Sequence, residues 1–117
     1  TGHMLFAQGD SLKLANEFSE KLIHIHCKDI RKNILSKSLT NDSTFRQAFL
    51  DGAFTVPGDG CIDYKPFLKV LKDKNYSGWL VVEAEQDPSK ANPFEYAKKG
   101  YNYLNKTAKE CGFEIIS

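Results

Sequence analysis

The sequence predicts an α/β fold with a parallel sheet, in which about two strands lie among flanking helices. Residues 22–27 alternate with a period of two and are rich in isoleucine, and residues 79–83 form a short apolar run after a turn. The segments around them have helical spacing, and strands that alternate with helices form parallel sheets. Because a sheet of two strands leaves both edges uncovered, the sequence also predicts that the chain is part of a larger structure.

The first half of the chain contains one predicted strand among helices. A helix begins at Asp10 or Ser11, either of which can cap it, and runs to about Lys21. The strand at residues 22–27 follows. We expect some helix in the polar stretch 28–41, and a short helix at residues 43–50, where apolar side chains recur on one side.

The second half repeats this order around the second strand. Residues 52–63 are rich in glycine and contain a proline, so they predict a loop. A helix then begins at Asp63 and precedes the strand at residues 79–83. Asn92 caps a last helix, with a proline at its first position, which runs to about Glu110 and is ended by Gly112.

Composition and charge exclude several classes of protein. The 117 residues suit one domain, and 41% apolar or aromatic with 26% charged residues is typical of globular chains. No apolar run is long enough to span a bilayer, and no signal peptide is visible. The net charge of +1 is scattered, which argues against nucleic acid as a partner. Three widely spaced cysteines suggest no disulfide framework, so we expect a cytoplasmic protein.

Alternation along the two strands sorts their side chains by face. On the first strand His24 and His26 share one face, and Ile23 and Ile25 share the other. If helices cover the apolar face, as in a parallel barrel, the histidines point inward. On the second strand the inward-facing set is Trp79, Val81 and Glu83. Trp79, low on this face, is expected to fill the interior, and Cys27 is expected in the outer core.

His26 and Glu83 are the candidate metal ligands. Both are expected on the inner face near the carboxyl ends of their strands, which is where parallel barrels place their active sites. A histidine nitrogen and carboxylate oxygens suit a divalent metal. The alternative is a hydrogen-bonded structural histidine and a solvated carboxylate.

Four segments resemble a known family. They read HIHCKDIR at 24–31, FTVPGDG at 54–60, GWLVVEAEQDP at 78–88 and ANPFEYA at 91–97. These are similar to motifs of the inosose dehydratases, and the similarity runs from the first residues to about Leu104. The resemblance implies that residues 1–117 are the C-terminal portion of a single (β/α)8 TIM barrel domain whose N-terminal part is missing.

The resemblance also implies a metal site. The wider group, the sugar isomerases and epimerases of the xylose-isomerase-like barrel type, holds its metal with Glu, Asp, His and Glu from four consecutive strands. By motif position His26 is the histidine ligand and Glu83 the last glutamate. The aspartate would come just before Thr1 and the first glutamate further upstream, so both are absent from this sequence. We expect manganese or cobalt as the metal.

The implied reaction removes water from an inosose, a cyclitol ketone, to give a diketo product. A divalent metal would stabilise the enediolate as a Lewis acid, while a base and an acid move protons. Glu83 is a candidate base or acid as well as a ligand, or is a ligand only. Lys28 is expected to donate to the leaving hydroxyl or to bind substrate oxygens, or is a surface lysine. Asp29 orients Lys28 or caps the turn, and the 57–60 loop covers the mouth or is an ordinary tight turn.

Three more residues are expected to bind substrate. His3 matches a substrate-contacting histidine of the family, provided that residues 2–4 (Gly-His-Met) are native and not the scar of an expression tag. Arg31 is expected to clamp a hydroxyl, or to lie exposed in a loop. Glu85 has the parity of Glu83 and is expected beside it.

Two alternatives to the dehydratase stay open. The first is another enzyme of the same group, an epimerase or isomerase of ketoses, against which the specific motifs argue. The second is a non-catalytic fragment, since the chain has two of the four implied ligands and about half of the roughly 250 residues of such a barrel. Expected partners are a small cyclitol ketone and, in a homo-oligomer, further copies of the chain.

Overall fold

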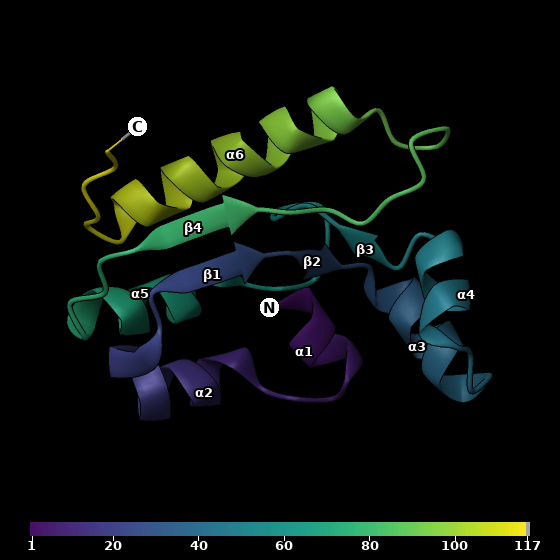
Figure 1. Ribbon diagram of the computed structural model, residues 1–117, viewed down its shortest axis with the longest axis horizontal. Helices are drawn as coiled ribbons and strands as arrows, with labels where there is room; N and C mark the ends of the chain where they lie inside the picture. The colour runs from purple at the N-terminus through teal and green to yellow at the C-terminus, as the bar shows by residue number, and fades with distance from the viewer. Residues whose placement is uncertain (117) are drawn as a thin grey trace.

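The computed structural model describes residues 1–116, so Ser117, the last residue of the predicted domain, lies outside the described residues. Two parallel strands lie side by side in the middle of the molecule, among helices (Figure 1). The elements in chain order are α1 (Gly2–Phe6), α2 (Ser11–Phe18), a 3-10 turn η1 (Ser19–Lys21), β1 (His24–Cys27), β2 (Asp29–Ile30), α3 (Lys32–Thr40), α4 (Phe45–Leu50), β3 (Phe54–Thr55), α5 (Tyr64–Asp73), β4 (Trp79–Val82) and α6 (Pro93–Glu110).

The two predicted strands pair in parallel, as expected. His24 lies opposite Trp79 and Cys27 opposite Val82, so the register places the carboxyl ends of β1 and β4 together. The ladder continues one residue further, because the Glu83 N–H donates to the Cys27 carbonyl at 3.2 Å. The side chains that follow both strands therefore start from the same edge of the sheet.

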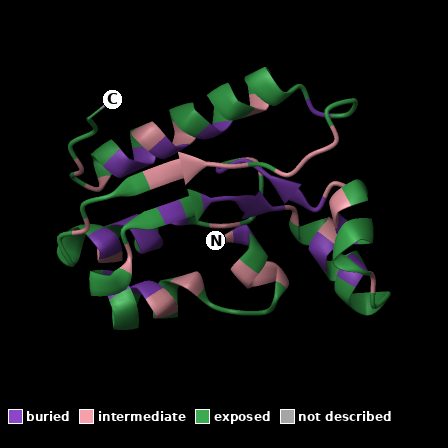
Figure 2. Ribbon diagram, in the orientation of Figure 1, coloured by how far each residue is buried: buried purple, intermediate pink, exposed green. Residues whose placement is uncertain are grey.

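The two faces of β1 differ in burial as the alternation predicts, whereas Leu80, Val81 and Val82 of β4 are all half-buried. Ile25 is 7% exposed and Cys27 is fully buried, whereas His24 and His26 are exposed, and Figure 2 shows buried and exposed residues alternating along β1. Trp79, expected to fill an interior, is 70% exposed on the uncovered face. One expectation is wrong: Ile23 is 73% exposed, because β1 begins only at His24 and the alternation does not reach Ile23.

Helices α2, α5 and α6 pack against the covered face and share one apolar core. Its fully buried members include Leu68 and Leu71 of α5, and each such side chain contributes roughly 1.5–3 kcal/mol of transfer free energy. Helix α6 comes close to the sheet through Gly100, where an added Cβ would lie 2.7 Å from Val82 and 2.8 Å from Val56. The helices thus fix the positions of both strands.

The helix ends follow the predicted caps. Asp63 accepts from the Lys65 N–H at 3.0 Å at the start of α5, and Asn92 caps α6 in the same way. Asp10 caps α2, but the α-helix ends at Phe18 and the expected continuation is a 3-10 turn. Within residues 1–116 no helix is both long and apolar enough to cross a membrane.

The sequence did not predict β2 and β3, which form an antiparallel ladder between residues 29–30 and 54–55. Each strand has two residues, too few for a period of two to be visible, and β3 lies inside the predicted loop 52–63. The ladder and the neighbouring helices α3 and α4 enclose a second apolar cluster around Ile30 and Phe54. It holds the segment after β1 in place.

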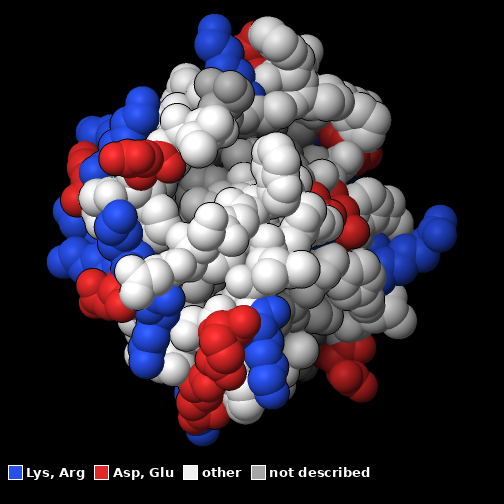
Figure 3. Space-filling view, turned by 60° about the vertical axis from the view of Figure 1, so that its left-hand side comes forward, with Lys and Arg blue, Asp and Glu red and all other residues white. Residues whose placement is uncertain are grey.

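The other edge of β4 has no partner strand within residues 1–116. A hollow of about 540 Å³ lies there, lined by apolar side chains that include Trp79, Leu80 and Tyr101. Figure 3 shows a face whose middle is occupied by uncharged residues, with the charged ones around its margin. An open edge beside an apolar hollow agrees with the prediction that the chain is part of a larger structure.

Candidate active site

The candidate site lies at the carboxyl ends of β1 and β4. Because alternate residues point the same way, His26 and Lys28 leave β1 on the uncovered side, and Glu83 and Glu85 follow β4 on the same side. Their side chains meet: Nδ1 of His26 lies 2.6 Å from Oε2 of Glu83. The structure therefore brings together the two predicted metal ligands.

Lys28 is the centre of the cluster. Its side chain is 2% exposed, and Nζ lies 3.2 Å from Oε1 of Glu83 and 3.0 Å from Oε2 of Glu85. The expectation of a surface lysine is therefore wrong. Taking an ammonium out of water is costly, and the two carboxylates offset that cost. The structure presents a cation held between two acids, with three N–H donors fixed in direction.

The two carboxylates are held in their charged form. Partial burial would raise the pKa of Glu83, but hydrogen bonds from Lys28 and His26 outweigh it, and the pKa is lowered. The same balance lowers the pKa of Glu85, with His3 and Lys28 as its partners. Both glutamates are thus ionised near neutral pH, as a base or a metal ligand requires.

His3 reaches this cluster from α1, far away in the sequence. Its Nε2 lies 2.9 Å from Nζ of Lys28 and 2.8 Å from Oε2 of Glu85. A protonated Nε2 donates to Glu85, whereas an unprotonated Nε2 accepts from Lys28, so the tautomer decides which bond forms.

The main chain at Lys28 is anchored by two hydroxyls that the sequence did not single out. Its carbonyl lies 2.7 Å from Oγ1 of Thr1 and 3.0 Å from the hydroxyl of the buried Tyr64. Gly2 fits so tightly that an added Cβ would lie 2.9 Å from the same carbonyl. Gly2 is therefore packed within the fold, and the native origin of residues 2–4 stays a prediction.

Asp29 forms hydrogen bonds to the loop after β3 and does not orient Lys28. Its buried carboxylate accepts from the backbone N–H groups of Ile30, Ile62 and Gly58 at 2.8, 2.9 and 3.2 Å. Burial raises the pKa of Asp29, and these backbone donors oppose the rise. Gly60 passes so close that an added Cβ would clash with the carboxylate. Of the two predicted roles, the structure shows the one that organises the turn.

Arg31 bonds within the protein. Its guanidinium donates to the Gly52 carbonyl at 2.7 Å, to Oγ1 of Thr55 at 3.1 Å and to Oδ2 of Asp59 at 2.8 Å. Asp59 also pairs with Lys99 of α6. Partial burial would raise the pKa of Asp59, but hydrogen bonds from Lys99, Thr55 and Arg31 outweigh it and lower the pKa. The substrate-binding role of Arg31 stays a prediction.

The 57–60 loop packs as an ordinary tight turn. Gly58 has φ of +83°, a backbone conformation that favours glycine. An added Cβ there would lie 2.5 Å from the Tyr103 ring of α6, so the loop rests on that helix. Through this contact and the pairing of its Asp59 with Lys99, the loop connects β3 to α6.

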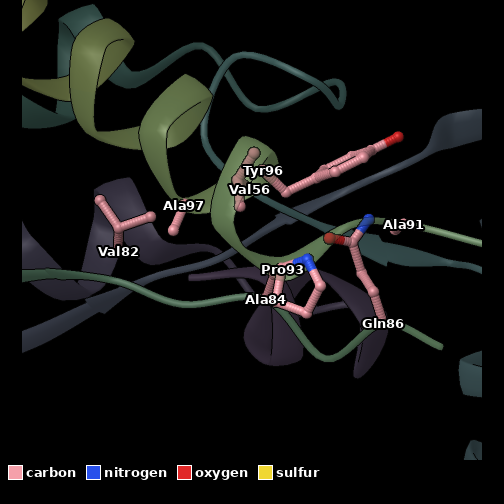
Figure 4. Close-up of a pocket in the computed structure, with 8 residues that line it drawn as sticks. All are labelled: Val56, Val82, Ala84, Gln86, Ala91, Pro93, Tyr96 and Ala97. Atoms are coloured by element: carbon pink, nitrogen blue, oxygen red, sulfur yellow. The ribbon is translucent and has the colours of Figure 1, made fainter. Parts of the chain in front are cut away.

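A small cavity of about 180 Å³ lies on the other side of the segment after β4 (Figure 4). Ala84 and Gln86 line it, as the alternation with Glu83 and Glu85 requires. Its other lining residues are Val56, Val82, Ala91, Pro93, Tyr96 and Ala97. This mostly apolar junction with α6 offers a polyol few polar partners, in contrast to the cluster around Lys28.

The donor set fits half of a divalent metal site. His26 offers nitrogen and Glu83 offers oxygen, both accepted by manganese and cobalt. Within residues 1–116 no group of three or more His, Cys, Asp or Glu side chains is placed to hold a metal. The metal site and its other ligands therefore stay a prediction.

The fold and the site together define an α/β protein with a histidine, two carboxylates and a buried lysine at the carboxyl ends of parallel strands. Residues 1–107 match the family model described as "Xylose isomerase-like TIM barrel", and the chain belongs to this family. The predicted fold class, part of a TIM barrel, is thereby confirmed.

Particular relatives are similar over nearly the whole chain. It is 44% identical over 106 residues to an inosose dehydratase of Clostridium beijerinckii, covering 91% of this chain and 36% of that protein. It is 46% identical over 112 residues to one of Geobacillus thermodenitrificans, covering 96% and 37%. With the rhizopine catabolism protein MocC of Rhizobium meliloti it shares 44% over 117 residues, covering 100% and 36%. The chain thus spans 36–37% of the length of these relatives.

Proposed function

We propose that the whole protein to which this chain belongs is a metal-dependent hydro-lyase that dehydrates scyllo-inosose in inositol catabolism. Relatives named inosose dehydratase, 44% and 46% identical, support the reaction. The observation that carries the proposal is the buried Lys28 between Glu83 and Glu85. A dehydration needs a proton donor beside a base, and this cluster supplies both.

Proton removal is the first requirement. The C–H beside a ketone is weakly acidic, and a carboxylate can take its proton as the ketone oxygen gains negative charge. Glu83, ionised and partly exposed, is the candidate base. Its position is compatible with two alternatives. Glu83 acts as both base and metal ligand, or it is a metal ligand only.

Departure of the hydroxyl is the second requirement. Lys28 donates a proton to the β-hydroxyl, which leaves as water, and the proton that Glu83 takes from carbon passes to Nζ, 3.2 Å from Oε1, so that both groups return to their starting forms. His3 and Glu85 hold Nζ in position. These two residues also remain candidates for binding the substrate hydroxyls, as predicted from the sequence. Their partial exposure makes them accessible to a ligand.

His26 and Glu83 would hold the metal, manganese or cobalt, with ligands from outside this sequence. When bound, it supplies Lewis-acid stabilisation of the enediolate. The free thiols of the three cysteines, none of them in a disulfide within the described residues, suit the cytoplasm as the place of this reaction.

The test uses the whole protein with scyllo-inosose and Mn²⁺ or Co²⁺. We expect an ultraviolet absorbance to grow as a conjugated enol or diketone product forms, and to stop when the metal is chelated. A protein that produces no such absorbance and instead converts ketohexoses is an isomerase or epimerase of the same family, and the dehydratase proposal is then wrong.

A further inference from the structure

A half-exposed aromatic ring stands beside the candidate site, and the proposed reaction does not use it. Phe45, the first residue of α4, is 46% exposed, and its ring centroid lies 5.4 Å from that of His3 in an edge-on arrangement. His3 in turn contacts Lys28 and Glu85 at 2.9 and 2.8 Å. One imidazole therefore separates the Phe45 ring from the charged groups.

The ring is held in place from behind. Its centroid lies 5.2 Å from that of Phe54 and 5.6 Å from that of Phe6. Phe54 is fully buried and also lies under Nζ of Lys28, 5.6 Å from it. The same buried ring thus supports both the cation and Phe45, so the polar cluster and the aromatic surface have a fixed relative position.

Charged groups lie on one side of this cluster and an aromatic surface lies on the other. Such a site suits a ligand that has both a polar part and an apolar face. In a six-membered polyol ring with equatorial hydroxyls, the oxygens lie around the rim and the C–H bonds point to the two faces. Such C–H groups are weakly positive, and the face of an aromatic ring is negative. An open-chain polyol has no such apolar face, because its hydroxyls point in all directions.

We propose that Phe45 is a specificity-determining residue that takes the C–H face of a cyclic polyol, while the groups around Lys28 take its oxygens. This inference rests on the proposed function, whose substrate is such a ring, and it deepens it by separating cyclic from open-chain polyols. Binding pockets generally combine an apolar wall with a few directed polar groups in this way.

The test measures binding without turnover, on the whole protein loaded with metal. The probes are myo-inositol, a ring, and mannitol, an open chain of the same carbon number, followed by saturation-transfer NMR and titration. We expect Phe45→Ala to weaken myo-inositol binding about tenfold and to change mannitol binding about twofold or less. Phe45→Leu, which keeps an apolar side chain without the π face, should lie between.

The matched control is Phe94→Ala, because Phe94 is 71% exposed at the start of α6, and its replacement should leave both ligands unchanged. If Phe45→Ala unfolds the protein, Phe45→Leu decides. Equal losses for both probes, no loss for either, or a wild-type preference for mannitol would each overturn the proposal. Absence of scyllo-inosose turnover, with a ring-selective effect at Phe45 intact, would refute the proposed reaction alone.

Discussion

Lys28 and Arg31 are three residues apart and both pair with carboxylates, yet their environments differ. Among residues 1–116, the polar partners of Nζ of Lys28 are all side chains, those of Glu83, Glu85 and His3. The guanidinium of Arg31 donates to the backbone carbonyls of Gly52 and Phe54, at 2.7 and 3.4 Å, as well as to Thr55 and Asp59. Lys28 thus interacts with a group of side chains, whereas Arg31 is also bonded to the backbone.

The difference separates a reactive cluster from a structural one. The partners of Lys28 are partly exposed side chains from α1 and from the segment after β4, so a ligand can replace them without moving the backbone. The partners of Arg31 define β3 and the turn after it, so losing the arginine disturbs their geometry. We therefore expect changes at Lys28 to act on the rate and changes at Arg31 to act on stability.

The largest effect is expected from Lys28→Met, which keeps the length of the side chain and removes the proton donor. In the whole protein kcat for scyllo-inosose should fall about 10²–10⁴-fold, the usual contribution of a general acid. The melting temperature should shift by only a few degrees, because the freed carboxylates are partly exposed. A variant that keeps more than a tenth of the wild-type kcat would remove Lys28 from the mechanism.

The second effect is expected from Arg31→Met. Urea unfolding should show a loss of about 2 kcal/mol, because two backbone carbonyls and Asp59 lose a charged donor. The control is Lys106→Ala, which breaks an exposed 4.0 Å pair with Glu110 and should cost about 0.5 kcal/mol or less. Unchanged stability with a strongly raised KM would instead support the predicted substrate contact of Arg31.

The smallest effect concerns Asp59 and pH. Because the folded protein lowers the pKa of Asp59, the ionised group stabilises the fold fully above the unfolded value of about 4, and this contribution disappears as the pH falls through the folded pKa. Denaturant unfolding at pH 6 and pH 3 should therefore show a larger acid loss of unfolding free energy in the wild type than in Asp59→Asn. Equal losses in both proteins would mean that the partners of Asp59 do not lower its pKa in the folded protein.

Much of the fold could be predicted because its signals are local. Alternation at residues 24–27 predicted a strand with a covered and an uncovered face, and the caps Asp63 and Asn92 marked the starts of α5 and α6. The β2–β3 ladder could not be predicted, since each strand has two residues and their pairing depends on a contact across the intervening helices.

The candidate site was likewise predicted only in part from the sequence. Parity placed His26, Glu83 and Glu85 on one side of the sheet, and the structure brings these side chains together around Lys28. Tyr64 was not predicted, because a tyrosine at a helix start carries no sign that its hydroxyl will meet a carbonyl 36 residues away. The ring of Phe45 beside His3 was missed for the same reason.

The sequence by itself determined the α/β class, the two parallel strands, the family and the residues that meet at the strand ends, because periodicity, caps and motifs are written along the chain. Only the tertiary structure decided that Lys28 is buried between two carboxylates while Arg31 is bonded to the backbone. The physical reason is that burial and pairing depend on which distant segments arrive at a side chain. Here α1 and the segment after β4 arrive at Lys28, and β3 and its turn arrive at Arg31.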